Sequence, residues 1–379
     1  MIYLDNAATT AMDQETVRAM YTYYTNNFAN PGSLYKLAND SRKAIETAKS
    51  QIAELIGARP HEIYFTSGGT ESNNLALMGT MLAMKERPHI ITAATEHESV
   101  INTCKMLEKM GCELTILGVR SDGLLGRETV ERAFKENTRM LSIMLVNNEI
   151  GVISPIEKFA KIAHEKGALL HVDAAAAVGI IPVDVKALDC DLMTGSAHKF
   201  GGPKGVGFLY VRDGVKIRKM MNGGSQQNGL RAGTENVPGI VGMGAAAELA
   251  GRDLEFRCRH IESLRNMLLN ELRNRIPGIS VNGSTSERVP CNINVSFQGV
   301  EGWKLVQALD EQGICISTGA MSALGEKGPS HVVRALGFGE DRAKCAVRIT
   351  LDHNNNMEQI ERVAGIIEEQ VARIRGFQY

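Results

Sequence analysis

Short apolar runs alternate with helical stretches from about residue 62 to residue 212. Seven of these runs have the length of buried strands. They cover 62–66, 89–93, 113–117, 140–146, 168–172, 191–194 and 206–212. Strands that alternate with helices favour an α/β fold, in which a mainly parallel seven-stranded sheet is covered by helices.

The spacing of apolar residues predicts the helices of this first part of the chain. Within 37–56 they recur at intervals of three and four, and Gly57 follows the pattern. This arrangement is typical of an amphipathic helix that ends at a glycine. Further helices are predicted over 71–84, 98–110, 127–135 and 156–166.

The pattern changes after residue 237. A long helical pattern covers 237–275, and shorter strands and helices then interleave. The predicted strands are 279–282, 292–297, a short one around Cys315, and 345–351, and the predicted helices are 301–312 and 356–375. This predicts a smaller α+β domain. We expect a large domain over 13–255 and a small domain over 256–379, with residues 1–12 packed nearby.

Length and composition narrow the class of protein. A chain of 379 residues is long enough for about two domains. The net charge of −1 gives no electrostatic footprint for nucleic acid or an anionic membrane. No apolar run reaches the length of about 20 residues that a membrane span needs, and the N-terminus does not resemble a signal peptide. The seven cysteines are scattered, which favours free thiols in the cytoplasm over disulfides or a metal site.

The stretch YFTSGGTESNNLAL at 64–77 joins a predicted strand to a predicted helix through two glycines. Backbone N–H groups at such a helix start can hold a phosphate group. The stretch lacks the Gly-Lys-Ser/Thr of a P-loop and the glycine spacing of a dinucleotide fingerprint. A plain strand-to-helix turn capped by Thr70 is the alternative.

Two further stretches place charged side chains after strands. In HVDAAAAVG at 171–179, Asp173 follows a strand, where it would cap a helix or pair with a cationic ring nitrogen. In TGSAHKFGGPKGVG at 194–207, Lys199 is either a solvated charge or a buried amine able to form a Schiff base, and Ser196 and His198 could bind the same phosphate. A phosphate cradle, an Asp and a Lys in this order describe a pyridoxal 5′-phosphate site.

With these motifs the chain resembles the cysteine desulfurases of the class V aminotransferase group. The resemblance covers essentially the whole chain. It is carried by YLDNAATT at 3–10, NPGS at 30–33, FTSGGTESNN at 65–74, TEHESV at 95–100, VNNEIGV at 146–152, HVDA at 171–174, SAHKFGGPKGVG at 196–207, RAGTEN at 231–236, PSHVVRALG at 329–337 and VRITL at 347–351. It implies the fold-type I architecture of pyridoxal-phosphate enzymes and the conversion of L-cysteine to L-alanine with sulfur transfer.

The resemblance also implies roles for individual residues. Lys199 would form the Schiff base with the cofactor and later move the α-proton of the substrate. Asp173 would keep the pyridine nitrogen protonated, and His97 would stack over the ring and take part in proton transfer. Asn148 would hydrogen-bond near the phenolic oxygen or the substrate, and Arg348 would bind the substrate carboxylate.

The phosphate would be bound by Gly69, Thr70, Ser196 and His198. Thr234 would complete the phosphate site of a neighbouring subunit, which implies a homodimer. A sulfur-acceptor protein and a part in iron–sulfur cluster assembly also follow from the resemblance.

The sequence departs from the family pattern at two positions. Most members have Gln where this chain has Ala176, and a methyl group cannot donate a hydrogen bond to the phenolic oxygen. Ser322 stands where the family has its nucleophilic cysteine, in the glycine-containing stretch ISTGAMSALGEKGPSH. Cys315 is a poor substitute, because it belongs to a predicted buried strand.

Ser322 is either a cysteine replaced to trap an intermediate or a natural variant with changed chemistry, and Ala176 favours the variant. Three functions stay open: a cysteine desulfurase disabled at the persulfide step, a direct C–S or C–Se β-lyase, and a catalytically silent paralogue acting as a partner or scaffold. Intact Lys199, Asp173, His97 and Arg348 weigh against the silent paralogue.

Overall fold

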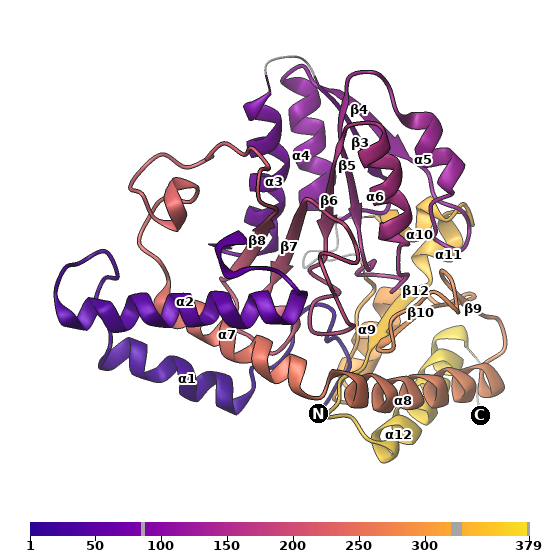
Figure 1. Ribbon diagram of the computed structural model, residues 1–379. Helices are drawn as coiled ribbons and strands as arrows, with labels where there is room; N and C mark the ends of the chain where they lie inside the picture. The colour runs from indigo at the N-terminus through magenta and orange to yellow at the C-terminus, as the bar shows by residue number, and fades with distance from the viewer. Residues whose placement is uncertain (85–87, 320–327, 377–379) are drawn as a thin grey trace.

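A seven-stranded sheet forms the centre of the computed structural model, which describes residues 1–84, 88–319 and 328–376 (Figure 1). The strand order is β2-β8-β7-β6-β5-β3-β4. The strands are β2 (Ile63–Thr66), β3 (His89–Ala93), β4 (Glu113–Leu117), β5 (Thr138–Met144), β6 (Leu169–Asp173), β7 (Leu192–Ser196) and β8 (Gly207–Val211). Only β8 of these seven runs antiparallel to its neighbours. The predicted mainly parallel sheet is confirmed, strand by strand.

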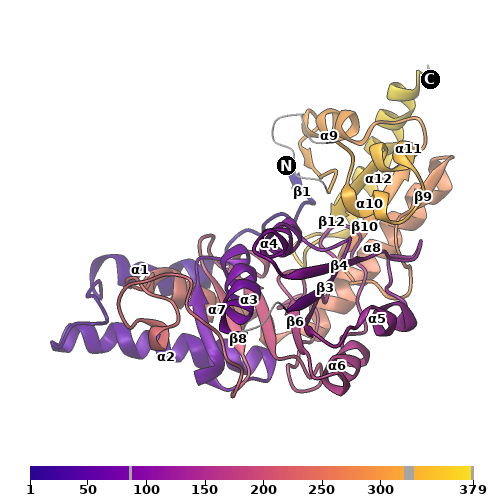
Figure 2. The ribbon, with the colours of Figure 1, turned by 90° about the horizontal axis from the view of Figure 1, so that it is seen from above.

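Helices cover both faces of this sheet. One face carries α3 (Gly69–Ala83) and α4 (Glu98–Lys109), and the other carries α2 (Lys36–Ile56), α5 (Arg127–Ala133), α6 (Ile156–Glu165) and α7 (Val237–Arg252). Successive strand residues point to opposite faces. Ile90 therefore packs in the cluster under α3 and α4, and Ile91 packs in the cluster on the other face. Figure 2 shows α4 and α6 on opposite sides of the strands.

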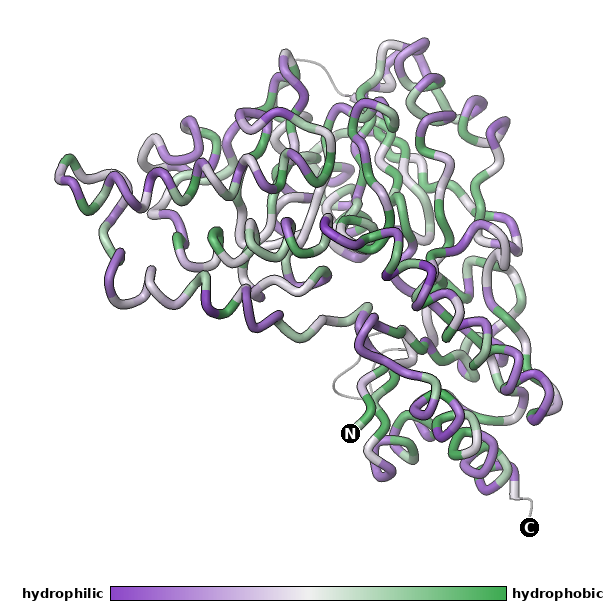
Figure 3. Tube along the Cα trace, turned by 60° about the horizontal axis from the view of Figure 1, so that its bottom comes forward, coloured by the Kyte–Doolittle hydropathy of each residue, from purple (hydrophilic) through white to green (hydrophobic). Residues whose placement is uncertain are grey.

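The C-terminal part of the chain forms a second core around a small antiparallel sheet. The sheet has the order β12-β10-β9 and consists of β9 (Ile279–Val281), β10 (Asn292–Phe297) and β12 (Ala346–Thr350). Around it lie α8 (Leu254–Arg275), α9 (Gly302–Asp310), β11 (Ile314–Cys315), α10 (His331–Ala335), α11 (Glu340–Lys344) and α12 (Met357–Arg375). Helices α8 and α12 contribute apolar side chains such as Leu268 and Ile367 to a separate hydrophobic cluster. In Figure 3 the central strands are the most continuously hydrophobic part of the chain.

The long pattern predicted over 237–275 is two helices, because the helix breaks at Asp253. The two separate hydrophobic clusters support a division of the chain into two domains near this break. We propose this division, and the expected boundary at 255 stays a prediction.

The first residues of the chain connect the two cores. Strand β1 (Ile2–Tyr3) pairs with β11, and Asp5 forms a bridge with Thr350 of β12. The backbone N–H of Thr10 then donates to the carbonyl of His198 at 2.9 Å. Helix α1 (Gln14–Thr25), which the sequence analysis does not identify, follows and packs on α7. No helix within the described residues is long and apolar enough to cross a membrane.

Candidate active site

A cavity of about 370 Å³ lies at the start of α3, where the sequence predicts a phosphate cradle. Strand β8 approaches the turn before α3 so closely that a Cβ on Gly207 would lie 2.7 Å from the backbone of Gly68. This close approach brings the turn next to the end of β7. The cavity is lined by Ala8, Thr9, Ser67, Gly68, Gly69, Thr70, Glu71, Ser196, His198, Lys204 and Gly205. Gly69, Thr70, Ser196 and His198, all predicted for phosphate binding, therefore share one cavity.

Most polar groups of this cavity suit an anion, and the carboxylate in its lining, that of Glu71, is paired with Arg231 at 2.8 Å. The N-terminus of a long α-helix carries a partial positive charge and free N–H groups. Lys204 adds a formal positive charge, which sequence reasoning did not assign although it lies in the SAHKFGGPKGVG motif. Burial, together with the nearby charges of Lys199 and Lys204, lowers the pKa of His198 to about 4. His198 is therefore neutral near pH 7, and its Nδ1 lies 3.2 Å from the hydroxyl of Thr9.

Lys199 lies in a short 3-10 turn directly after β7, next in sequence to His198, which lines the cavity. Its Nζ donates to the carbonyl oxygens of Ala7 at 2.5 Å and Ala8 at 3.0 Å. Burial lowers the pKa of this amine from 10.5 to about 8, helped by the positive charge of Arg348 and opposed by the carboxylates of Asp173 and Asp5. A lysine with such a pKa is half uncharged near pH 8 and can act as a nucleophile or a base.

Asp173 and His97 are joined by a chain of hydrogen bonds. Asp173 ends β6 and is 4% exposed. Its Oδ2 accepts from Nδ2 of Asn73 on α3 at 2.7 Å, and the same nitrogen donates to the hydroxyl of Ser99 at 2.8 Å. That hydroxyl lies 2.8 Å from Nδ1 of His97, which caps the N-terminus of α4. The predicted pair of site residues is thus linked through two side chains that the sequence analysis did not single out.

Arg348 is a buried cation on β12. It is 2% exposed, and its guanidinium donates to Asp5 Oδ1 at 2.7 Å and to the carbonyl of Asn148 at 2.9 Å. Removing one partner of a buried ion pair costs about 3–5 kcal/mol, because an uncompensated charge remains. Asp5 was not predicted as a site residue. Arg348, which pairs with Asp5, also lies close enough to Lys199 to lower the pKa of the Lys199 amine.

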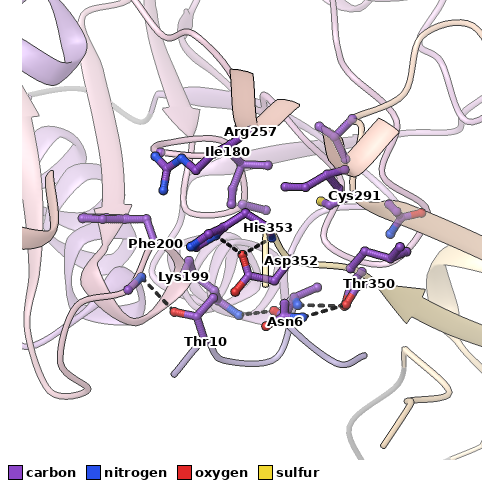
Figure 4. Close-up of a pocket in the computed structure, with 18 of the residues that line it drawn as sticks. Asn6, Thr10, Ile180, Lys199, Phe200, Arg257, Cys291, Thr350, Asp352 and His353 are labelled. Carbon is purple, nitrogen blue, oxygen red and sulfur yellow. Dashed lines mark hydrogen bonds and ion pairs between the residues drawn. The ribbon is translucent and has the colours of Figure 1, made fainter. Parts of the chain in front are cut away.

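A second cavity of about 290 Å³ lies on the other side of the N-terminal segment and reaches Lys199, Asn148 and Ala176. In the view of Figure 4, Lys199 lies between Thr10 and Asn6. Because residue 176 is an alanine, this cavity has no long side chain there to hydrogen-bond a ligand. The predicted departure at Ala176 thus falls in the wall of a cavity beside the buried amine.

Four predicted residues line neither of these two cavities: His97, Asp173, Thr234 and Arg348. Thr234 is exposed and lines neither of them, so it does not contribute to the predicted phosphate cavity of its own chain. Ser322 lies outside the described residues. Cys315 lies in β11 as predicted but is only partly buried, and burial raises the pKa of its thiol.

The described residues that flank 320–327 lie against one buried carboxyl group, that of Glu149. The hydroxyl of Ser330 donates to Glu149 Oε2, and a Cβ on Gly319 would lie 2.8 Å from the same oxygen. Burial raises the pKa of Glu149. Glu149 belongs to the VNNEIGV motif, next to Asn148, but no role was predicted for it from the sequence. Its place in that motif is the signal that could have found it.

A family model described as Aminotransferase class-V matches residues 2–363. The chain belongs to this family. Members of the class V family among the curated proteins resemble it over almost its full length. Cysteine desulfurase IscS of Methanosarcina thermophila is 42% identical over 375 residues, which cover 99% of this chain and 93% of that protein. A cysteine desulfurase of Nostoc sp. is 43% identical, with 99% of this chain and 94% of that protein covered.

Solved structures of the family agree with the fold. A protein described as NifS-like superposes with a TM-score of 0.93 at 36% identity, covering 98% of this chain and 99% of its own. The structure of SspA in complex with cysteine gives a TM-score of 0.81 at 34% identity, covering 94% of this chain and 100% of its own. These likenesses confirm the family resemblance and the fold expected from the sequence, and they make the chain an enzyme of the class V family.

Proposed function

We propose that this chain is a pyridoxal 5′-phosphate-dependent cysteine desulfurase that acts on L-cysteine and is slow at sulfur transfer because residue 322 is a serine. The observation that carries the proposal is the buried amine of Lys199, with its pKa lowered to about 8. This amine lines the second cavity, follows His198 of the cavity at the start of α3, and is within electrostatic range of both Asp173 and Arg348. The names of the relatives support L-cysteine as the substrate.

The residues present fit pyridoxal phosphate in three separate respects. The cavity at the start of α3 offers backbone N–H groups, hydroxyls and Lys204 to a phosphate. Lys199 offers an amine that can lose its proton near pH 8. Asp173 offers a buried carboxylate at the end of a strand, held by Asn73, which suits a protonated ring nitrogen. No one of these groups would specify the cofactor alone.

When bound, pyridoxal phosphate withdraws electrons from the α-carbon of an amino acid. Lys199 would hold the cofactor and, as a base, move the α-proton of the substrate. Asp173 would keep a positive charge on the ring nitrogen, and His97 would stack over the ring. Gly69, Thr70, Ser196 and His198 would hold the phosphate, and Lys204 would balance its charge.

Arg348 and Asn148 would bind the substrate. The guanidinium of Arg348 can form paired hydrogen bonds with a carboxylate, and in the structure one of its amino groups already holds the carboxylate of Asp5. The side-chain oxygen of Asn148 is buried and has no hydrogen-bond partner in the described part of the chain. A buried oxygen without a donor is costly. An amino group or hydroxyl of a ligand would supply that donor.

Ser322 limits the proposed reaction at sulfur transfer. A thiol with a pKa near 8.5 supplies a thiolate that can attack sulfur, and a serine hydroxyl does not ionise in this range. A C–S β-lyase is the second candidate, because direct elimination needs no thiol nucleophile and Ala176 also departs from the desulfurase pattern. A silent partner protein is the third, and the polar site around Lys199 speaks against it.

The proposal is tested by adding pyridoxal phosphate to the purified protein and removing the excess. We expect a yellow protein, because the cofactor bound through a lysine absorbs visible light, and we expect L-cysteine to change that absorption. Absorption spectra before and after L-cysteine measure both steps. A colourless protein that cannot be reconstituted would rule out the proposed function.

We further propose a homodimer in which Thr234 completes the phosphate site of the partner. Its exposed position supports this, because Thr234 lines neither of the two cavities of its own chain. Light scattering of the holoenzyme should give about twice the chain mass of 41.2 kDa. A fully loaded enzyme with the mass of a single chain would contradict the shared site.

A further inference from the structure

Asn73 and Ser99 lie between the two groups proposed to flank the cofactor ring. We propose that they are positioning residues that fix the proton of the neutral His97 ring on Nε2 and couple this choice to the carboxylate of Asp173. The inference deepens the proposed function and rests on it for its part in the reaction. The hydrogen-bond directions that it requires follow from the chain itself.

The carboxylate of Asp173 sets the orientation of the Asn73 amide. Asn73 is 1% exposed, and its amide nitrogen donates both to Asp173 Oδ2 and to the hydroxyl of Ser99. An ionised carboxylate only accepts hydrogen bonds. The reversed amide would therefore place one oxygen against another. The amide oxygen has no hydrogen-bond partner within the described residues, so the bonds of the nitrogen alone hold the side chain.

The direction of the next bond follows from this orientation. Because the hydroxyl of Ser99 accepts from Asn73, its single proton is available for Nδ1 of His97, which lies 2.8 Å away. The backbone N–H of Ser99 independently donates to the same ring nitrogen at 3.2 Å. A ring nitrogen that accepts hydrogen bonds carries no proton in the neutral imidazole. The proton of neutral His97 is therefore on Nε2.

This arrangement makes Nε2 the N–H donor of the exposed His97 ring. Nε2 makes no hydrogen bond with any described residue, so its N–H can serve as a donor to a bound ligand. Helix capping accounts for the bond from the backbone of Ser99, but it does not require the hydroxyl or Asn73. The carboxylate of Asp173 orients the amide of Asn73, and this amide orients the hydroxyl of Ser99. The hydroxyl then donates to Nδ1 of His97, which leaves Nε2–H as the donor of the ring. One carboxylate would thus serve both the ring nitrogen and the stacking imidazole.

Nitrogen NMR of the full-length protein with ¹⁵N-labelled histidine tests the proposal, because protonated and bare ring nitrogens have well-separated resonances. The His97 signals are assigned by their loss in His97→Gln. We expect a single Nε2–H tautomer in the unchanged protein, measured both with pyridoxal phosphate and without it. In Asn73→Ala the Ser99 hydroxyl is free to accept from Nδ1–H, so we expect a mixture of tautomers.

Two serine variants and one neighbouring asparagine sharpen the test. Ser99→Ala leaves only the longer backbone bond to Nδ1, so the Nδ1–H tautomer should become detectable, whereas Ser99→Thr keeps a hydroxyl and should restore the single tautomer. Asn74→Ala is the matched control, because among the described residues the side chain of Asn74 bonds to the carbonyl of Thr70 in its own helix, and the His97 signals should not change.

A neutral His97 ring that carries its proton on Nδ1 in the unchanged protein would overturn the proposal. Unchanged His97 signals in both Asn73→Ala and Ser99→Ala would overturn the coupling between Asp173 and the His97 tautomer. Two variants are used because one of them could fail to fold. A failure of pyridoxal phosphate to bind would count against the proposed function alone, because the tautomer is also measured without the cofactor.

Discussion

Lys199→Ala is expected to abolish covalent attachment of pyridoxal phosphate and, with it, turnover of L-cysteine. The reason is that no other described lysine has a pKa lowered to about 8 and lines the cavity that Asn148 and Ala176 also line. Attachment is measured as visible absorption that stays with the protein after gel filtration. The exposed Lys166→Ala is the control and should keep its colour and activity.

The pH dependence of attachment checks the same amine. An uncharged amine is needed to attack the aldehyde of the cofactor, so the rate for the cofactor-free protein should rise as pH increases through about 8. An ordinary lysine would show its midpoint near 10.5. Because the charge of Arg348 helps to lower the pKa, Arg348→Met should move the midpoint upward. Stable covalent attachment in Lys199→Ala would remove the basis of the proposed site.

Ser322→Cys is expected to raise the production of L-alanine from L-cysteine by orders of magnitude. The unchanged protein should bind L-cysteine, because Arg348 and Lys199 are both present, but it lacks a thiolate that can take the sulfur. Alanine and sulfide are measured with a thiol reductant present to release bound sulfur. Ser286→Cys, which adds a thiol at an exposed serine elsewhere in the chain, controls for the reactivity of any new cysteine.

The products separate the remaining functions. Strong activity with Ser322 in place, giving pyruvate and ammonia rather than alanine, would establish the β-lyase in place of the desulfurase. If Ser322→Cys alone brings no gain, Ala176→Gln is added to supply the missing hydrogen-bond donor. If the double variant binds cofactor and substrate but still forms no alanine, the desulfurase proposal fails.

Alternating apolar runs were sufficient to predict the central sheet. Both faces of the sheet are covered by helices, so most strand residues are apolar, and all seven runs form strands. Helix α1 was missed because little of it is buried: Met20 packs inside, but Tyr21 and Tyr24 are exposed. The break at Asp253 was missed because the sequences on both sides of it are helical.

Some residues of the candidate site could be predicted from the sequence, and others could not. Lys199 and Asp173 could be predicted because each follows a strand within a distinctive motif. Asp5 could not, because its partner Arg348 lies in the last strand and only the fold brings the two together. Asn73 and Ser99 were hidden for a related reason, since local spacing does not reveal hydrogen bonds between α3, α4 and β6.

The proposed function depends above all on the amine of Lys199 as the group that holds pyridoxal phosphate. Its most direct test is borohydride reduction of the reconstituted protein, followed by proteolysis and mass spectrometry of the peptides. Our account predicts one modified peptide, with the pyridoxyl phosphate group on Lys199 in the sequence SAHKFGGPK. A group attached to a different lysine, or no modified peptide from a protein that has bound the cofactor, would contradict it.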